Sequence, residues 1–281
     1  MTVVVIGDAL IDEMRDERGS VDAPGGSALN VAVGLSILGV PAVLVAMYAD
    51  DSEGQALSAH LDRYTVAHLV SPSALGTGRA VSDRSEGEPR YSFNAASVAR
   101  AIDFTPPVRS AITDADLVAI SGFPFDNQEQ FDQLLDAVAG STVLLDPNPR
   151  AGFMRDASLF ASNLERFASS LRLLKIGEED AQLLYGKSLD EVVGYFSPHT
   201  AVLATAGAAG ATIYERGSAL TRPIVHSTAP IVDTMGAGDA TFASVIASLS
   251  QGEGDWSVIL DRAMAIAAAT IRHHGGVLRT S

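Results

Sequence analysis

A glycine-rich turn leads directly into an apolar helical run near the C-terminus of this chain. The string Asp233-Thr234-Met235-Gly236-Ala237-Gly238-Asp239 precedes a helix-forming stretch from Ala240 to Leu249. Two glycines and an alanine allow the backbone to curl tightly and to point successive N–H groups at one spot. The free N–H groups and the dipole of the following helix attract negative charge to the same place. The string therefore predicts a phosphate-binding turn.

Asp239, the last residue of this string, has two interpretations. An acidic residue in the first turn of a helix contributes about 0.3–1 kcal/mol of stability without any catalysis. Beside a phosphate site, the same carboxylate is placed to take a proton from a hydroxyl that attacks a phosphoryl group. The residue type and its position leave both interpretations open.

A second glycine-rich turn precedes a helix near the N-terminus. The segment Gly25-Gly26-Ser27-Ala28-Leu29-Asn30 leads into a run in which apolar residues recur at helical spacing as far as Gly39. Asn30 lies inside this helix, where it costs about 0.5 kcal/mol relative to Ala and where capping does not explain it. A ligand contact is the functional interpretation; a tight turn followed by a structural Asn is the alternative.

Two acidic residues follow the first predicted strand. The β-branched run Thr2–Ile6 is apolar on both faces, as expected for a central parallel strand, and Asp8 and Asp12 come just after it. Ligands of open α/β sheets bind outside the carboxyl ends of such strands. Because carboxylates accept hydrogen bonds from vicinal diols, these two residues favour a neutral polyol as ligand.

Strands and helices alternate along the chain. Alternation of this kind predicts an α/β fold, with a parallel sheet covered by helices on both faces. Further strands are predicted at residues 41–48, 117–121, 142–146, 171–176 and 201–204, and helices at 52–64, 127–139 and 178–185. The polar, Gly-rich stretch from Gly76 to Phe93 differs from the rest and suggests exposed strands that project from the sheet.

Composition excludes several function classes. The chain has 281 residues, no Cys and a formal net charge of −15. Without Cys there is no disulfide, thiolate metal site or thiol nucleophile. The acidic balance argues against nucleic acid or an anionic membrane as partner. No apolar run reaches the roughly 18–20 residues that span a bilayer, and no secretory leader precedes the first strand. We expect a cytoplasmic enzyme.

Taken together, these segments resemble the ribokinase-like (PfkB) carbohydrate kinase family over nearly the whole chain. The string 233–239 matches the family's Asp-Thr-x-Gly-Ala-Gly-Asp signature, and Gly25-Gly26 followed by Asn30 resembles its N-terminal signature. The likeness is nearest to the fructokinase and ketosugar-acid kinase branch. It implies a three-layer α/β/α sandwich with a central, mostly parallel sheet and a small β lid. The whole range 1–281 forms one domain in this view, with lid segments near 12–21 and 76–95.

The resemblance also implies roles for individual residues in an ATP- and Mg²⁺-dependent sugar kinase. Asp239 is the implied catalytic base, and the implied anion hole is Gly236, Ala237 and Gly238. The implied sugar ligands are Asp8, Asp12, Gly25, Gly26 and Asn30. The implied ATP-binding residues are Thr205, Gly207, Gly210, Thr234 and Gly238.

Three charged residues have a weaker basis. Arg150 ends an Asp-x-Asn-x-Arg element similar to that of the fructokinase branch, so it clamps a phosphate or an acidic substrate group, or forms a salt bridge to a neighbouring acid. Asp180 lies where the family carries the Glu of its magnesium-organising Asn-x-x-Glu, but Gly177 replaces the Asn. Asp233 matches a position that often holds a monovalent cation such as K⁺.

The substrate stays open among several classes. We predict a small neutral sugar, fructose first, phosphorylated on a primary hydroxyl; a ketosugar acid or a sugar phosphate also fits. A nucleoside kinase would favour an apolar lid, whereas the lid sequence is polar, with Arg79, Asp83, Arg84, Glu86, Glu88 and Arg90. A non-catalytic sugar-binding regulator is the alternative outside enzymes. A homodimer formed through the lid is a further expectation.

Overall fold

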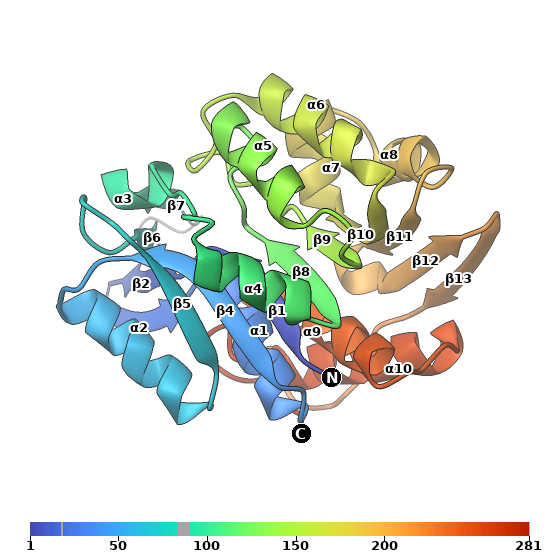
Figure 1. Cartoon of the computed structure of the whole chain (residues 1–281). Helices are drawn as coiled ribbons and strands as arrows, with labels where there is room; N and C mark the ends of the chain where they lie inside the picture. The colour runs from blue at the N-terminus through green and yellow to red at the C-terminus, as the bar shows by residue number, and fades with distance from the viewer. Residues whose placement is uncertain (18, 84–89, 281) are drawn as a thin grey trace.

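The computed structural model describes residues 1–17, 19–83 and 90–280. Within these residues the chain forms one large sheet, one small sheet and helices on both faces of the large sheet (Figure 1). The order of strands is β13-β12-β11-β10-β9-β8-β1-β4-β5 in the large sheet and β3-β2-β6-β7 in the small one.

In the large sheet, all neighbouring strands from β5 across to β11 are parallel to one another. The pairs β11–β12 and β12–β13 are antiparallel. Its strands are β1 (Val3–Gly7), β4 (Ala42–Tyr48), β5 (Ala67–Pro72), β8 (Leu117–Ser121), β9 (Val143–Asp146), β10 (Leu171–Gly177), β11 (Ala201–Thr205), β12 (Ala211–Glu215) and β13 (Ser218–Arg222). Strand β1 lies in the middle and its apolar residues are fully buried, which confirms the central parallel strand that its β-branched run predicts.

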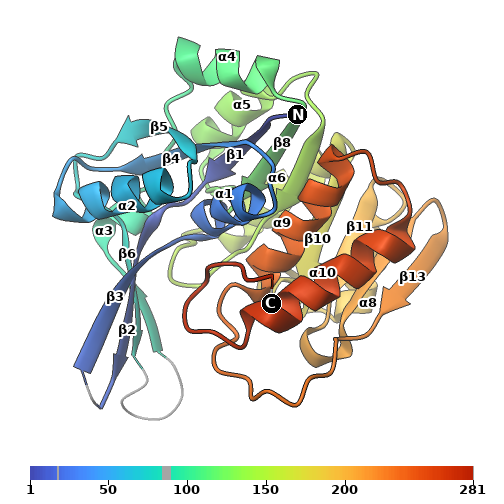
Figure 2. The same ribbon diagram turned by 90° about the horizontal axis from the view of Figure 1, so that it is seen from below.

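Two layers of helices enclose the sheet. One face is covered by α1 (Ser27–Ile37), α2 (Ser52–Arg63), α9 (Ala237–Ser250) and α10 (Trp256–Thr270), which are in front of the sheet in Figure 2. The other face is covered by α4 (Pro106–Asp114), α5 (Gln128–Ala137), α6 (Ala157–Ala168), α7 (Glu178–Tyr185) and α8 (Leu189–Phe196). The three-layer α/β/α sandwich is therefore confirmed.

The small sheet, which we call the lid, projects from the edge of the body (Figure 2). Its strands are β2 (Leu10–Asp16), β3 (Gly19–Gly25), β6 (Arg79–Asp83) and β7 (Arg90–Phe93), followed by the short helix α3 (Ala95–Val98). These strands overlap the segments near 12–21 and 76–95, and their role as a lid stays a prediction. Arg84, Glu86, Glu88 and the side chain of Arg90 lie outside the described residues.

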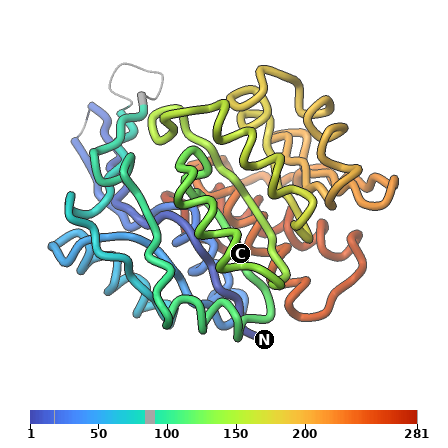
Figure 3. The backbone as a smooth tube through the Cα atoms, turned by 45° about the horizontal axis from the view of Figure 1, so that its top comes forward, coloured from blue at the N-terminus to red at the C-terminus, as the bar shows by residue number. Residues whose placement is uncertain are grey.

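The topology brings the two ends of the chain together at the site. Helix α1 packs against α9, so the blue N-terminal and red C-terminal parts of the chain lie side by side in Figure 3. The carboxyl ends of β1, β8, β9 and β10 all reach the same edge, where α1 and α9 begin. Among the described residues, no helix combines the length and the apolar character that crossing a membrane requires.

Candidate active site

A cavity of about 600 Å³ lies between the lid and the carboxyl ends of the strands. Most of the residues singled out from the sequence line it: Asp8, Asp12, Gly26, Asn30, Arg150, Asp180, Thr205, Gly207, Thr234, Gly236, Gly238 and Asp239. Gly25, Gly210, Asp233 and Ala237 lie close by in the chain but do not line it. The structure therefore gathers residues from both ends of the sequence around one cavity.

Asp239 is held by two donors from the start of α1. The Ser27 hydroxyl donates to Oδ1 of Asp239 at 2.6 Å, and Nδ2 of Asn30 donates to Oδ2 at 2.9 Å. The Ser27 hydroxyl also contacts Oγ of Ser121 at 2.5 Å. Because a serine hydroxyl has one proton, and Ser27 gives it to Asp239, Ser121 donates to Ser27. Asn30 is thus a partner of the proposed base, a contact that the sequence did not indicate.

The environment of Asp239 suits a proton acceptor. Burial raises the pKa of Asp239, while the hydrogen bonds from Ser27 and Asn30 lower it in part. A carboxyl whose pKa lies above its ordinary value accepts a proton more readily in the transition state. The two donors also fix the direction of both carboxylate oxygens.

The turn before α9, which is predicted to form the anion hole, has two N–H groups without an acceptor among the described residues. Gly236 caps the helix in a left-handed conformation, with φ of 75°. The N–H of Ala237 already donates to the Thr234 carbonyl at 3.3 Å. Among the described residues, the N–H groups of Gly238 and Asp239 have no acceptor. These two amides are therefore the free donors at the N-terminus of α9.

Gly276, near the C-terminus, packs closely against this turn. A Cβ on Gly236 would lie 2.4 Å from the carbonyl oxygen of Gly276, and a Cβ on Gly276 would lie 2.6 Å from Nδ2 of Asn30. The three residues thus pack without space for a further side chain. This contact fixes the α9 turn relative to Asn30, and through Asn30 relative to Asp239.

The opposite wall carries the two carboxylates predicted to bind sugar. Burial raises the pKa of Asp8 to about 6, and burial together with the nearby charges of Asp8 and Asp239 raises the pKa of Asp12 to about 7. Two glycines make room for them: a Cβ on Gly25 would lie 1.9 Å from the Asp12 carboxylate, and one on Gly122 would lie 2.4 Å from that of Asp8. The absence of a side chain at Gly25 therefore makes room for the Asp12 carboxylate.

Arg150 extends over the cavity from the loop after β9. Its guanidinium lies 3.5 Å from the Glu179 carboxylate, and both side chains are exposed, so this ion pair contributes little stability. The charge of Arg150 lowers the pKa of Asp12 and of Asp180 against the raising effect of burial. Arg150 therefore acts electrostatically on both Asp12 and Asp180, and the neighbouring acid that the sequence left open is Glu179.

The sequence missed a buried ion pair in the wall. Nζ of Lys175 on β10 lies 2.7 Å from Oδ2 of Asp146 on the adjacent strand β9, and both residues line the cavity. Asn148, two residues after Asp146, has a left-handed φ of 42°, which Asn tolerates better than most residues. A lysine inside the apolar strand LRLLKIG was the available signal for this pair.

The two candidate metal residues are engaged in local structure. Oδ2 of Asp180 accepts the Gly177 N–H at 2.7 Å and so caps α7. Asp233 accepts the N–H groups of Met235 at 3.1 Å and of Gly275 at 3.2 Å. Among the described residues, no group of three or more His, Cys, Asp or Glu side chains is arranged to hold a metal.

The predicted nucleotide loop follows β11 and contains the 3₁₀ turn η1 (Gly207–Ala209). Thr205 and Gly207 line the cavity. Gly210 does not: its φ is 94°, and a Cβ there would lie 2.1 Å from the carbonyl oxygen of Arg222. Position 210 therefore requires glycine, because the backbone at the end of β13 leaves no space for a Cβ atom.

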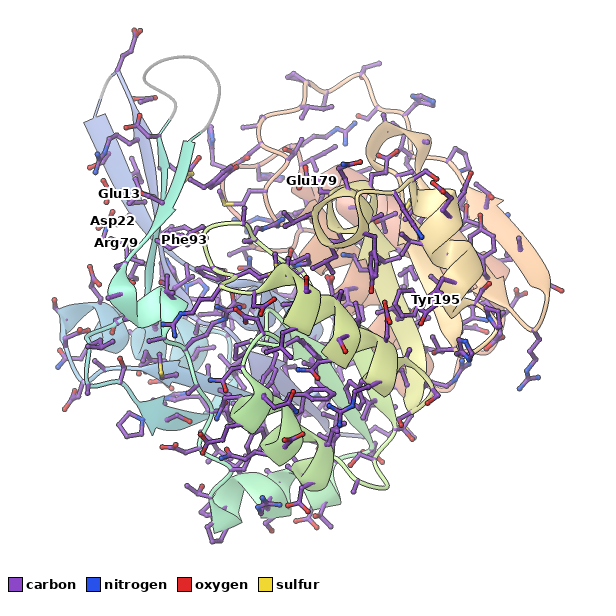
Figure 4. The ribbon with its side chains drawn as sticks, turned by 90° about the horizontal axis from the view of Figure 1, so that it is seen from above. Glu13, Asp22, Arg79, Phe93, Glu179 and Tyr195 are labelled. Atoms are coloured by element: carbon purple, nitrogen blue, oxygen red, sulfur yellow. The ribbon has the colours of Figure 1, made fainter. Side chains whose placement is uncertain are left out.

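The expectation that the lid presents a polar surface to the substrate is wrong for the described residues. Apart from Asp12 on β2, the residues of the lid and the adjoining loop that line the cavity are apolar or aromatic: Leu10, Ala80, Tyr91, Phe93 and Phe153. Arg79 points the other way and binds Glu13, Asp22 and Glu53 (Figure 4). Phe93 lies on the opposite side of the lid, facing the body and Glu179 (Figure 4). Successive side chains of a strand point to opposite faces, so polar residues can gather on the outer face of the lid and apolar residues on the inner face. The composition of the whole lid does not show this difference between its faces.

Comparison with known proteins identifies the family. The profile of the family described as "pfkB family carbohydrate kinase" matches residues 2–280. A fructokinase from Rhizobium leguminosarum bv. trifolii is 31% identical over 265 residues, covering 88% of this chain and 79% of that protein. A fructokinase from Klebsiella pneumoniae is 29% identical over 266 residues, covering 88% and 83%.

A solved structure shares the fold. The fructokinase double mutant from Vibrio cholerae O395, in its fructose-, ADP- and potassium-bound form, has a TM-score of 0.81 at 23% identity. The match covers 98% of this chain and 93% of that one. The ribokinase-like fold predicted from the sequence is therefore confirmed. Because the family profile spans nearly all of the sequence, this chain belongs to the pfkB family of carbohydrate kinases and is an ATP-dependent sugar kinase.

Proposed function

We propose that this enzyme transfers the γ-phosphoryl group of ATP to a primary hydroxyl of fructose, with Asp239 as general base. The observation that carries the proposal is the position of Asp239: half-buried, held by Ser27 and Asn30, and in one cavity with Asp8 and Asp12. The relatives named fructokinase, at 25–31% identity, support the sugar.

In the proposed reaction, the sugar lies near Asp8 and Asp12 and ATP lies toward Thr205, Gly207 and the α9 turn. The sugar oxygen forms a bond to the γ-phosphorus, and the bond from that phosphorus to the bridging oxygen of ADP breaks. Asp239 takes the hydroxyl proton, and the electron pair of the broken bond stays on ADP. Since the transition state is loose, positioning and charge stabilisation by the Gly238 and Asp239 amides contribute most.

The residues present fit a Mg²⁺ ion whose ligands come mainly from ATP phosphates and water molecules. Oδ1 of Asp146 is buried without a hydrogen-bond partner among the described residues, and Asp180 keeps one oxygen outside its cap, so both can accept hydrogen bonds from water on the ion. Bound Mg²⁺ would neutralise charge on the phosphates. A K⁺ ion near Asp233 is part of the proposal, supported by the potassium-bound relative.

A nucleoside kinase is the second candidate, and one observation favours it. Tyr91 and Phe93 turn aromatic rings toward the cavity, and such a surface suits a flat base as well as the C–H face of a sugar. A ketosugar acid or a sugar phosphate would use Arg150 as its cation. We keep fructose first because the relatives named fructokinase cover most of the chain.

A substrate panel tests the proposal. Purified enzyme with MgATP is given fructose, a ketosugar acid, a hexose phosphate and adenosine, and ADP release is measured for each. We expect fructose to show the highest kcat/KM. Higher kcat/KM for adenosine would establish the second candidate instead, and sugar binding without any ADP release would indicate a non-catalytic regulator.

Two further properties belong to the proposal: a homodimer formed through the lid, and a cytoplasmic location. Val21 and Tyr91 on the lid are 62% and 59% exposed, and burial of such apolar side chains supports an interface between two copies. The mass of the protein in solution, compared with that of Val21→Glu, tests the dimer. A single mass that equals one chain for both proteins would contradict it.

A further inference from the structure

A buried lysine lines the cavity and has no role in the reaction proposed above. The chain contains two lysines, Lys175 and Lys187, and Lys187 is exposed in the loop between α7 and α8. Lys175 is 6% exposed, in a strand whose other interior residues pack in the core. A buried ammonium requires compensation, because burial alone disfavours its charge.

Asp146 compensates that charge incompletely. Lys175 donates to Oδ2 of Asp146 at 2.7 Å, and the pairing of Leu174 with Leu145 explains why the two side chains are neighbours on adjacent strands. An ammonium has three N–H donors, yet Asp146 is its one hydrogen-bond partner among the described residues. Oδ1 of Asp146 also lacks a partner there. A purely structural buried pair would leave these groups unsatisfied at a cost in stability.

The unsatisfied side of the pair faces the start of α9. Both residues line the 600 Å³ cavity, and a Cβ on Gly238 would lie 3.4 Å from Nζ of Lys175. Burial lowers the pKa of Lys175, but the charges of Asp146, Asp180 and Asp239 together hold that pKa above its ordinary value, so the group stays an ammonium. The ammonium and the free amides of Gly238 and Asp239 therefore border the same space.

We propose that Lys175 is a catalytic residue whose ammonium binds an oxygen of the γ-phosphoryl group during transfer, and that Asp146 positions it. The inference rests on the proposed phosphoryl transfer at Asp239. As the bond to ADP lengthens and the bond to the sugar oxygen forms, negative charge on the phosphoryl oxygens is met by Lys175 on one side and by the α9 amides on the other. Lys175 forms no covalent bond and gives up no proton.

The test replaces the whole ion pair, since removing Lys175 alone would leave Asp146 as an unpaired buried charge. In Lys175→Met/Asp146→Asn we expect kcat to fall roughly 10²–10³-fold, the loss typical of one donor to a developing oxyanion. The KM for fructose should change less than about threefold. Lys187→Met, which removes the other lysine, should keep normal kinetics. Near-normal kcat in the folded double variant would overturn the inference.

A binding measurement separates contact with the phosphoryl group from a structural role. We would measure the Kd of ADP alone and of ADP with aluminium fluoride, which imitates the transferring group, with and without fructose. We expect the double variant to bind ADP normally and to lose the gain in affinity that aluminium fluoride gives the unmodified enzyme. Equal weakening of both complexes would show that the pair only shapes the site.

These experiments also separate the inference from the function on which it rests. Absence of fructose-dependent ADP release by the unmodified enzyme would refute the proposed function, and the measurement with ADP and aluminium fluoride would still decide the role of Lys175. Should the double variant fail to fold, Asp146→Asn keeps the ammonium but loosens its position. We then expect a kcat roughly tenfold lower, and an unchanged kcat would overturn the role of Asp146 as the positioning residue.

Discussion

Two polar networks in this enzyme differ in burial and in what they join. The first joins Ser27 and Asn30, which are buried, to the half-buried Asp239 where α1 meets α9, and it links residues more than 200 positions apart in the sequence. The second is Arg79 with Glu13, Asp22 and Glu53, on the outer side of the lid and partly exposed. We infer that the buried network orients a reactive group, whereas the exposed one attaches the lid to α2.

The largest expected effect tests the centre of the buried network. Asp239→Asn keeps the shape of the side chain but removes the proton acceptor and one of the two oxygens to which Ser27 and Asn30 donate. The kcat should therefore fall roughly 10²–10⁴-fold with little change in ATP affinity. Steady-state kinetics with fructose and nucleotide titration measure the two quantities. Near-normal turnover would remove Asp239 from the mechanism.

The second prediction distinguishes Asn30 as partner of the base from Asn30 as sugar ligand. Asn30→Ala removes one hydrogen bond to a carboxylate, so kcat should fall roughly 10–10²-fold. Because that bond lowers the pKa of Asp239, its loss should move the rising limb of the rate profile to higher pH. A raised KM for fructose with an unshifted profile would instead identify Asn30 as a sugar ligand.

The third prediction concerns Ser27. Ser27→Ala removes the donor to Oδ1 of Asp239 and should lower kcat roughly 3–10-fold, again with a shift of the rate profile to higher pH. Ser121→Ala is the matched control, because Ser121 contacts Ser27 and not the base. A larger effect for Ser121→Ala than for Ser27→Ala would contradict this order of contacts.

The fourth prediction concerns pH and stability. The pKa values of Asp8 and Asp12 are about 6 and about 7 in the folded state, against 3.8 in the unfolded chain. Between pH 4 and 7 the folded state therefore binds more protons, and the stability that this binding contributes is lost as pH rises through 6–7. The free energy of unfolding should be roughly 4 kcal/mol higher at pH 5 than at pH 8.

Asp12→Asn should remove most of that difference, because the amide does not titrate. Denaturant unfolding at both pH values measures it. A free energy of unfolding that rises between pH 5 and pH 8 would show that these carboxyls are ionised in the folded protein without penalty.

The smallest effect belongs to the exposed network. Arg79→Gln leaves Glu13, Asp22 and Glu53 without their shared cation, and the free energy of unfolding should fall by roughly 1 kcal/mol at low salt and less at high salt. The kcat and the KM for fructose should stay within about twofold. A large loss of kcat would mean that lid attachment, and not only the buried network, sets the rate.

Local patterns in the sequence determined much of this protein. The β-branched run of β1, the alternation of strands and helices, and the glycine-rich turn before α9 each depend on residues adjacent in the chain. For that reason the sandwich, the lid segments and the turn next to Asp239 were predictable. The position of Asp8 followed from the general rule that ligands bind at the carboxyl ends of parallel strands, whereas Asp12 lies on the lid strand β2.

Only the tertiary structure decided which side chains meet. The contact of Asn30 with Asp239 depends on the packing of α1 against α9, and the pair Lys175–Asp146 on the register of β10 with β9. The inner and outer faces of the lid depend on which side of each short strand turns to the body. These choices are made by burial over long sequence separations, where the same local pattern is compatible with several partners.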